Sequence, residues 1–401
     1  MFALGDSTKA KRRVLVLATT LPAVRGDGTP QFVLDLSLGL QRTFDVCIVT
    51  PRVSGAKREE WIDGVYVRRF AYFPHRWESL AEGAILPNLK ARPATSVQVP
   101  FLLGAYLRAA VEAGRRFRPD VIHAHWLLPG GLVALAVARS RKIPYIVTVH
   151  GADAFALHAP GLEQLKKTVM RNAEVVGLTS GALAEAVPEV PTVPQPVIPM
   201  GVDVEAFASG IGARVPVDGK LLFVGRLAEK KGVDVLLQAM AEVPEATLVI
   251  GGDGPDAPAL GALSERLGLA DRVRFAGRIS RAQLREELRS AAAVVVPSRV
   301  AADGDQDTTP LVMSESMSAG VPVIASRLGG LAERIEPGVT GLLAEPGSVE
   351  SLTEVLREAL ADPKRLDGYG RAAQERIRGS DLDLETTVAR YTEILERAVS
   401  R

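Results

Sequence analysis

Cations and carboxylates able to bind a sugar nucleotide stand in two segments of the chain. Residues 223–232 form an apolar run that ends in a glycine and then presents Arg226 and Lys231. Residues 307–315 begin with Asp307 and end with Glu315, around the start of an expected helix. Guanidinium and ammonium groups bind diphosphates as a fork and as a point charge, and carboxylates accept hydrogen bonds from sugar hydroxyls. The two segments therefore indicate a site for a nucleotide-diphosphate sugar.

The expected helix after Asp307 adds backbone donors to this site. Pro310 suits the first position of a helix, with Thr308 or Thr309 as the cap. The free amides near Pro310, Leu311 and Val312 then form an anion site beside the two carboxylates. Glu315 falls one turn inside an otherwise apolar helix, which is costly unless it has partners. Ribose hydroxyls or an internal salt bridge are the two candidates.

Short apolar runs that alternate with helical patterns must position these side chains. Runs of this kind occupy residues 14–19, 46–50, 121–125, 145–149, 175–179, 221–224, 247–250, 273–275, 293–296 and 321–325. Continuous Val, Ile and Leu favour parallel strands that are buried on both faces. The sequence thus predicts an α/β protein of two doubly wound, Rossmann-like domains.

Prolines mark the boundary between the two domains. Five of them, from Pro188 to Pro199, predict an extended linker over residues 188–216 in which the first domain's last strand is embedded. We expect an N-terminal domain over 1–200, a C-terminal domain over 201–383, and a helix over 384–401 that packs back on the first domain. Ligands of open parallel sheets bind beyond the carboxyl ends of the strands, which places the site in a cleft between the domains.

The bulk composition narrows the class of protein. Of 401 residues 47% are apolar, and the formal net charge of +1 gives no field that would attract nucleic acid. The single Cys47 excludes a disulfide framework, so a cytoplasmic setting fits. Basic residues from Lys9 to Arg13 before the first apolar run imitate a short signal peptide, but a first buried strand is favoured. No run is long enough to span a bilayer.

Taken together, the motifs resemble the retaining glycosyltransferases of family 4, which have the GT-B fold. The resemblance covers nearly the whole chain. It is carried by segments 225–232, 252–255, 275–277, 296–298, 307–315, 319–323 and 329–333, and in the first domain by 123–126 and 150–153. One departure is that Asp307 stands where the family's paired acids begin with glutamate.

The resemblance implies a role for each matching position. Arg226 and Lys231 would hold the donor diphosphate, Glu315 the ribose, and Asp307 the hydroxyls of the sugar ring. The remaining donor-side positions are Gly26 and Gly28 in a loosely matched N-terminal glycine loop, Gly252, the nucleobase-contacting backbone of Gly277, Arg278 and Ile279, and the helix start at Pro310, Leu311 and Val312. His150 would approach the transferred sugar as a catalytic group beside Arg226, Lys231 and Asp307. His125 and Asp153 would lie on the acceptor side.

The implied activity is retaining transfer of a hexose from a nucleotide-diphosphate sugar, UDP favoured and GDP possible. The acceptor would be a hydroxyl of a lipid-linked glycan or a small molecule. The resemblance implies neither a cofactor nor a metal. His123 with His125, and the segment 303–305 with its two aspartates, lack the further ligands that a metal site needs.

Several alternatives stay open or are weakened at this stage. A nucleotide-sugar 2-epimerase or a non-catalytic nucleotide-sugar-binding protein would share the fold. A dehydrogenase is disfavoured because no Gly-x-Gly-x-x-Gly follows the first strand. Residues 52–118 are expected to hold the acceptor. Their aromatic and basic side chains either contact the inner membrane face peripherally or simply face solvent.

Overall fold

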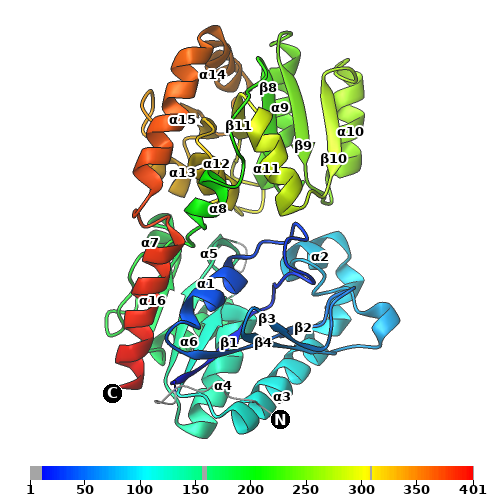
Figure 1. Ribbon diagram of the computed structural model, residues 1–401. Coiled ribbons are helices and arrows are strands. Elements are labelled where there is room, and N and C mark those ends of the chain that lie inside the picture. Colours follow the sequence, from blue (N-terminus) through cyan, green and yellow to red (C-terminus); the bar gives the residue numbers. More distant parts are fainter. Residues whose placement is uncertain (1–10, 156–159, 308, 401) are drawn as a thin grey trace.

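The computed structural model describes residues 11–155, 160–307 and 309–400. It has two lobes, one above the other, each built around a sheet (Figure 1). Lys9 and Thr308, named above as part of a signal-like segment and as a helix cap, lie outside the described residues. Both sheets are parallel apart from one edge pair, and the predicted doubly wound α/β fold is confirmed.

Within the described part of the chain, seven strands form the first sheet. Their spatial order is β3 (Glu59–Ile62), β4 (Val65–Phe70), β2 (Asp45–Pro51), β1 (Arg13–Leu17), β5 (Val121–His125), β6 (Tyr145–Val149) and β7 (Val175–Leu178). Strands β5 and β6 have the predicted bounds. The sequence did not predict β3 and β4, which form an antiparallel hairpin at one edge.

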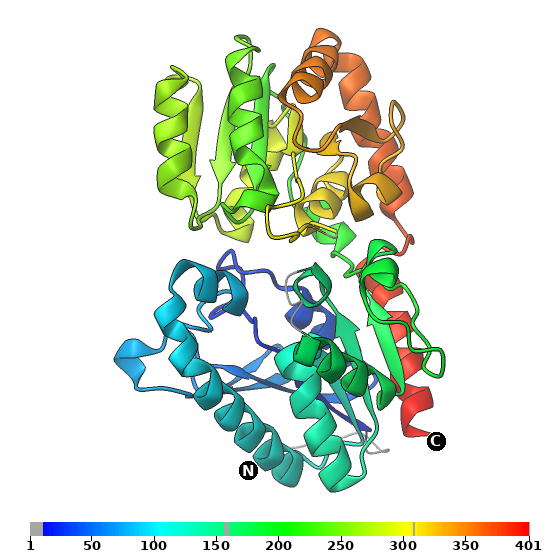
Figure 2. The ribbon, with the colours of Figure 1, turned by 180° about the vertical axis from the view of Figure 1, so that it is seen from behind.

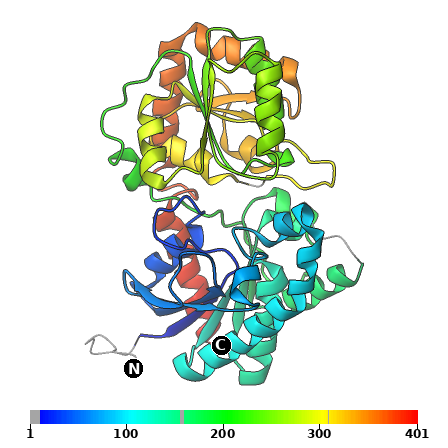
Figure 3. The ribbon, with the colours of Figure 1, turned by 90° about the vertical axis from the view of Figure 1, so that its right-hand side faces the viewer.

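Helices cover both faces of this sheet (Figures 2 and 3). They are α1 (Phe32–Leu40), η1 (His75–Trp77), α2 (Ile85–Ala91), η2 (Pro93–Gln98), α3 (Val99–Phe117), η3 (Leu127–Gly131), α4 (Leu132–Arg141), α5 (Gly151–Phe155), α6 (Pro160–Arg171) and α7 (Ala182–Ala186). Side chains of α3 and α4 form one hydrophobic core with one face of the sheet, and α1 forms a second core with the other.

The second sheet contains six strands among the described residues. Their order is β10 (Val273–Gly277), β9 (Thr247–Gly251), β8 (Lys220–Val224), β11 (Ala293–Val296), β12 (Val323–Ser326) and β13 (Gly341–Ala344). All pairs are parallel, as the continuous apolar runs predicted. Strand β13 was not predicted.

The second domain also has helices on both faces of its sheet (Figure 3). They are η4 (Glu229–Lys231), α9 (Val233–Ala241), α10 (Ala257–Arg266), α11 (Arg281–Ser290), α12 (Leu311–Ser318), α13 (Gly329–Arg334), α14 (Val349–Ala361) and α15 (Pro363–Ile377). Two further cores, one on each face, hold them in place.

The connection between the domains differs in detail from the predicted linker. No full strand forms around residue 198, where only an isolated bridge joins Val197 to Leu178 on β7. A short helix, α8 (Val204–Ala208), lies inside the segment expected to be extended. Asp203 accepts a hydrogen bond from the Ala206 amide and so caps this helix, a local signal that outweighs the preceding prolines.

The last helix, α16 (Leu384–Val399), runs down the side of the first domain and ends there (Figure 1). Its Tyr391 is buried, stacks on the ring of His123 and shares a 2.8 Å hydrogen bond with Thr148 on β6. Where α16 begins, Val202 and Asp383 form a bridge, so the chain passes between the lobes twice at neighbouring points. Among the described residues, no helix combines the length and apolarity needed to cross a bilayer.

Candidate functional site

A cavity of about 850 Å³ lies between the two domains. The first domain contributes mainly hydroxyls, amides and small residues, and the second contributes glycines, arginines and the start of α12. The lining includes Thr20, Gly28, Thr29, Gln31, Phe32, Asp35, Ser79, Glu82, Asn88, Arg92, Thr95 and Trp126 from the first domain. From the second come Gly225, Arg226, Lys231, Gly252, Asp253, Arg278, Ile279, Arg281, Pro310, Leu311, Val312 and Glu315.

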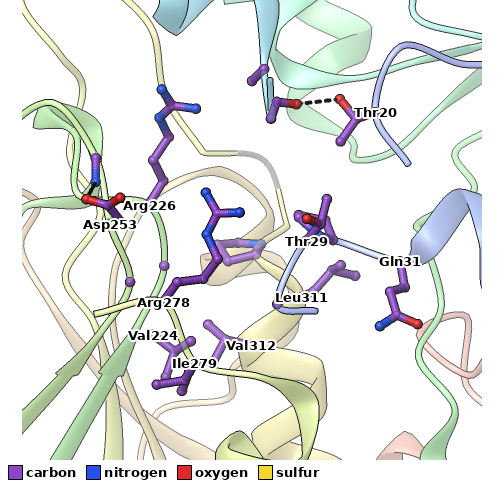
Figure 4. A pocket seen from close by; sticks show the side chains of 18 of the residues that line it. Thr20, Thr29, Gln31, Val224, Arg226, Asp253, Arg278, Ile279, Leu311 and Val312 are labelled. Atoms are coloured by element: carbon purple, nitrogen blue, oxygen red, sulfur yellow. Dashed lines mark hydrogen bonds between the residues drawn. The ribbon is translucent and has the colours of Figure 1, made fainter. Parts of the chain in front are cut away.

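Arg226 and Arg278 extend their guanidinium groups into the same part of this cavity (Figure 4). Arg226 follows β8 and Gly225, and its Nε has no hydrogen-bond partner among the described residues. Burial lowers the pKa of Arg226, the positive charge of Arg278 lowers it further, and Asp253 opposes both effects. In the part of the chain that the structure describes, neither arginine forms an ion pair closer than 4 Å. The arrangement concentrates positive charge where an anion could neutralise it.

The backbone turn beneath Arg226 depends on Gly252. This residue has φ 148° and lies so close to Gly225 that a Cβ would meet the Gly225 carbonyl oxygen at 1.8 Å. The loops that follow β8 and β9 therefore pack backbone against backbone, which a side chain would prevent. This close packing brings the two glycine-rich loops to the floor of the cavity.

Lys231 reaches the cavity from η4 but is also paired with a carboxylate. Its Nζ donates to Oδ2 of Asp307 at 2.7 Å, and the hydroxyl of Ser298 donates to the same oxygen at 2.6 Å. Burial tends to raise the pKa of Asp307, but Lys231 and Lys230 outweigh burial and hold this pKa below its usual range. Asp307 is 8% exposed and is not part of the cavity lining.

Glu315 lines the cavity from the second turn of α12. Burial raises its pKa to about 7, the nearby Asp35 raises it too, and Arg281 and Arg285 lower it. The expected alternative of an internal salt bridge is not seen, because no ion pair to Glu315 is present among the described residues.

Helix α12 begins at Leu311, with Pro310 in the preceding cap position, so the prediction of Pro310 as the first helical residue was wrong by one position. No side chain caps α12 within the described residues, which also corrects the expectation for Thr309.

The loop between β1 and α1 brings the first domain into contact with the second. Asp27 folds this loop by accepting hydrogen bonds from the amides of Ala23 and Thr29 at 2.7 and 2.8 Å. Gly28 has φ 84°, and a Cβ there would lie 2.4 Å from the carbonyl oxygen of Ile279. The Arg281 amide donates to the carbonyl of Gly26. The two domains therefore touch at this rim of the cavity.

The histidines of the first domain lie behind the cavity wall. The ring of His150 packs at a tilt against those of Phe32 and Trp126, which line the cavity, with ring centroids 5.1 and 4.6 Å away. His125 Nδ1 lies 3.2 Å from His150 Nε2. Burial lowers the pKa of His150 to about 3, so its ring is neutral near pH 7. Phe32 and Trp126 thus stand nearer the open space than the histidines do.

Asp153 organises the backbone around these rings. Its carboxylate accepts hydrogen bonds from the amides of Leu127, Leu128 and His150 at 3.0, 3.3 and 3.3 Å. Burial raises the pKa of Asp153 to about 7, and the three amides act in the opposite sense. The residue is buried and is not part of the cavity lining, so its contacts here are with the protein's own backbone.

The structure gathers most, but not all, of the predicted site residues around one space. Ten of them line the cavity: Gly28, Arg226, Lys231, Gly252, Arg278, Ile279, Pro310, Leu311, Val312 and Glu315. Six do not: Gly26, His125, His150, Asp153, Gly277 and Asp307. Within the described ranges, no group of three or more His, Cys, Asp or Glu side chains is arranged to hold a metal ion.

Many polar lining residues were not predicted, among them Gln31, Asp35 and Arg281. Gln31 is 7% exposed, and its Oε1 lacks a hydrogen-bond partner among the described residues although it borders the cavity (Figure 4). Asp35 and Arg281 form an ion pair of 3.3 Å. The sequence could have indicated a functional role for Asp35, because its carboxylate stands on the otherwise apolar face of a helix.

Comparison with known proteins places this geometry in a family. A model described as Glycosyl transferase 4-like domain matches residues 27–201, and one described as Glycosyl transferases group 1 matches residues 213–376. A D-inositol 3-phosphate glycosyltransferase of Kribbella flavida is 31% identical, with 78% of this chain and 81% of that protein covered. The chain belongs to the group 1 glycosyltransferases. The glycosyltransferase is also 27% identical to a glycogen synthase of Mycobacterium tuberculosis, with 95% of this chain and 94% of that protein covered.

Solved structures share the fold of this glycosyltransferase. Sucrose-phosphate synthase from Thermosynechococcus elongatus superposes with a TM-score of 0.78 at 21% identity, covering 97% of this chain and all of the other. The HepE protein of Anabaena, in complex with UDP-glucose, gives a TM-score of 0.71 at 19% identity, with coverages of 96% and 99%. The predicted GT-B architecture and the prediction of a glycosyltransferase are confirmed.

Proposed function

We propose that this glycosyltransferase moves a hexose from a UDP-sugar, or less readily a GDP-sugar, to a hydroxyl acceptor, with retention at the anomeric carbon. The observation that carries the proposal is the pair Arg226 and Arg278. Two guanidiniums share one cavity without ion-pair partners among the described residues. A diphosphate is the anion that a glycosyltransferase donor brings to such a position.

The donor fits the cavity in the following way. The diphosphate lies between Arg226, Arg278 and Lys231, close to the free amides at the start of α12. Glu315 accepts hydrogen bonds from the ribose hydroxyls, which supply the partners that its carboxylate lacks in the protein. The nucleobase lies against the backbone of Arg278 and Ile279. UDP is favoured because HepE, which shares the fold, was solved with UDP-glucose.

The chemistry requires stabilisation of the leaving group. As the anomeric carbon–oxygen bond breaks, negative charge grows on the diphosphate, and preorganised donors lower the barrier because they are already in place. Arg226, Lys231 and the α12 amides are such donors. The departing diphosphate then receives the acceptor's proton as the hydroxyl attacks from the same face of the sugar. Contact between the Gly28 loop and Ile279 joins the two domains at the rim of the cavity, and closure of this kind limits the access of water to a reaction.

The acceptor occupies the first-domain side of the cavity in this proposal. The lining there offers hydroxyls and amides from Thr20, Thr29, Gln31, Asn88 and Thr95. Such neutral groups suit a polyol or a sugar rather than a flat apolar molecule. A lipid-linked glycan and a small polyol both satisfy this chemistry, and His125 and Asp153 hold the wall behind it.

Two exposed aromatic side chains of the first domain support peripheral membrane contact. Trp77 is 55% and Phe101 is 54% exposed, and Arg76 lies over the Trp77 ring at 4.4 Å. Aromatic rings with an adjacent cation suit the interfacial region of an anionic bilayer. Flotation with phosphatidylglycerol vesicles tests this: Trp77→Ser with Phe101→Ser would release the protein if the surface binds lipid. Equal flotation of the double variant would contradict it.

One incubation tests the proposed reaction. Purified protein is mixed with UDP-, GDP- and ADP-glucose and a panel of polyols and lipid-linked sugars, and both released nucleotide and product are followed. Transfer with an α-configured product from an α-linked donor, seen by NMR, is the expected result. Conversion of the donor into its 2-epimer would support the epimerase instead. Binding without any conversion across the panel would support a non-catalytic nucleotide-sugar-binding protein.

A further inference from the structure

Asp307 faces Lys231 rather than the open space. Oδ2 accepts one hydrogen bond from Lys231 Nζ at 2.7 Å and one from Ser298 Oγ at 2.6 Å, while Oδ1 lies 3.9 Å from Lys230 Nζ. The side chain is buried and is absent from the cavity lining. One of its two oxygens is thus fully used by the protein itself.

Lys231, in contrast, both borders the cavity and holds Asp307. An ammonium group has three protons, and the bond to Asp307 uses one of them. Lysine side chains have flexible stems, so a fixed partner behind the ammonium group restricts where its other two protons point. Among the described residues only Asp307 accepts a hydrogen bond from this ammonium group, which leaves its other two protons available to a ligand in the cavity.

The segment that carries Asp307 is itself tied to the turn that carries Lys231. The Arg299 amide donates to the carbonyl of Lys230 at 2.9 Å, and the Ala302 amide donates to Glu229 at 3.0 Å. Lys230 also pairs with Asp305 at 3.1 Å. Residues 299–307 and 229–231 therefore form one hydrogen-bonded unit, in which the positions of Asp307 and Lys231 depend on each other.

We propose that Asp307 is a positioning residue, which fixes the ammonium group of Lys231 for the donor diphosphate and does not contact the transferred sugar. The inference rests on the proposed function and refines it at this acid. It differs from the role that the family resemblance implies, in which the first acid faces the sugar hydroxyls. The aspartate's shorter arm fits a carboxylate that ends on Lys231 and Ser298.

The test separates the two roles by using UDP, which has a diphosphate but no sugar. Affinities for UDP and UDP-glucose are measured by calorimetry for the wild-type protein, Asp307→Asn, Lys231→Met and the double variant. We expect Asp307→Asn to weaken both ligands by the same factor, about fivefold to tenfold. In the Lys231→Met variant the same substitution should change neither affinity, because the ammonium group that Asp307 positions is no longer present.

The matched control is Asp381→Asn, which removes an ion pair to Arg334 in the same domain, where both residues lie outside the cavity lining and outside the unit formed by residues 229–231 and 299–307. This control should leave the affinities for UDP and UDP-glucose unchanged. Asp307→Glu, which keeps the carboxylate, should bind both ligands more tightly than Asp307→Asn does. Three results would each overturn the inference. Asp307→Asn could weaken the binding of UDP-glucose alone, it could leave both affinities unchanged, or it could weaken binding equally in the Lys231→Met variant and in the wild-type protein. If the wild-type protein binds none of UDP, GDP and ADP, the proposed function itself is contradicted. That outcome is distinct from failure of the inference, which requires a wild-type protein that binds UDP.

Discussion

Asp35 of α1 and Arg281 of α11 form an ion pair of 3.3 Å that joins the two domains across the cavity. Both side chains are largely buried, and Arg281 also lowers the pKa of Glu315. Burial raises the pKa of Asp35, and Arg281 is the strongest opposing influence. The Arg281 guanidinium thus pairs with Asp35 of the first domain and also stabilises the charged form of Glu315 in its own domain.

This pair should stabilise the closed arrangement of the domains. We expect Asp35→Asn to increase the ligand-free radius of gyration in small-angle X-ray scattering, because one of the described contacts across the cavity is lost. Asp63→Asn is the control, since Asp63 pairs with Arg25 on the surface of the first domain alone. An unchanged scattering profile for Asp35→Asn would show that the other contacts suffice.

Loss of Arg226 should damage catalysis more than stability. We expect Arg226→Ala to lower kcat by about 10²–10³, because removal of one preorganised donor to a developing anion has this effect. Arg266→Ala, on the exposed side of α10, is the control for a lost surface charge. A normal kcat in Arg226→Ala, measured by nucleotide release, would refute the assigned role.

Gly26 and Gly28 offer a matched pair for the contact between the domains. Both have positive φ, at 86° and 84°, so an alanine is strained to a similar degree at either position. Only at Gly28 would the new Cβ meet the other domain, 2.4 Å from the carbonyl oxygen of Ile279. We expect Gly28→Ala to lower kcat/KM at least tenfold more than Gly26→Ala, with similar melting temperatures. Equal activities would mean that this contact is unimportant for transfer.

Glu315 should destabilise the ligand-free protein at high pH. Its pKa is raised to about 7 in the folded state, against about 4.5 for an ordinary glutamate. Between these pH values the folded protein binds a proton that the unfolded chain lacks, so the stability of the fold falls as pH rises and the loss is complete above about pH 7. Glu315→Gln should therefore raise Tm near about pH 8 and much less near about pH 5. A gain that is independent of pH would contradict this reading.

The buried histidines should produce the opposite dependence. Burial lowers the pKa of His123 and of His150 to about 3, so the unfolded chain takes up protons that the folded protein excludes. Each group then costs up to about 1.4 kcal/mol of stability per pH unit below about pH 6. We expect His123→Gln to flatten the decline in urea stability between pH 7 and pH 5, relative to the exposed His75→Gln control. Parallel curves would disprove it.

Local sequence patterns were sufficient to predict most of the fold. The continuous apolar runs predicted ten strands and their parallel burial because a strand covered on both faces needs no polar alternation. Strand β3 alternates between exposed and partly exposed residues at a sheet edge, and so lacks that pattern. Its hairpin had a separate signal in Asp63-Gly64, a typical two-residue turn. Strand β13 is four residues long and begins with glycine, which leaves too little pattern to detect.

The site was predictable only where a residue's own segment determines its position. Arg226 and Glu315 follow directly from the end of β8 and from the face of α12. The pairs Asp307 with Lys231 and Asp35 with Arg281 join residues far apart in the chain, and their geometry depends on how loops and domains pack. The same holds for His150, whose distance from the cavity is set by Phe32 and Trp126.

Helix α16 has a consequence for how the protein is made. Its Val388, Tyr391 and Leu395 complete the hydrophobic core on one face of the first sheet, although they follow the whole second lobe in the chain. During synthesis, the core of the first lobe therefore cannot be completed until the entire second lobe and α16 have emerged from the ribosome. Assembly of the two lobes is coupled by this order of events, because the lobe that is translated before the other reaches its final packing only after the other has emerged.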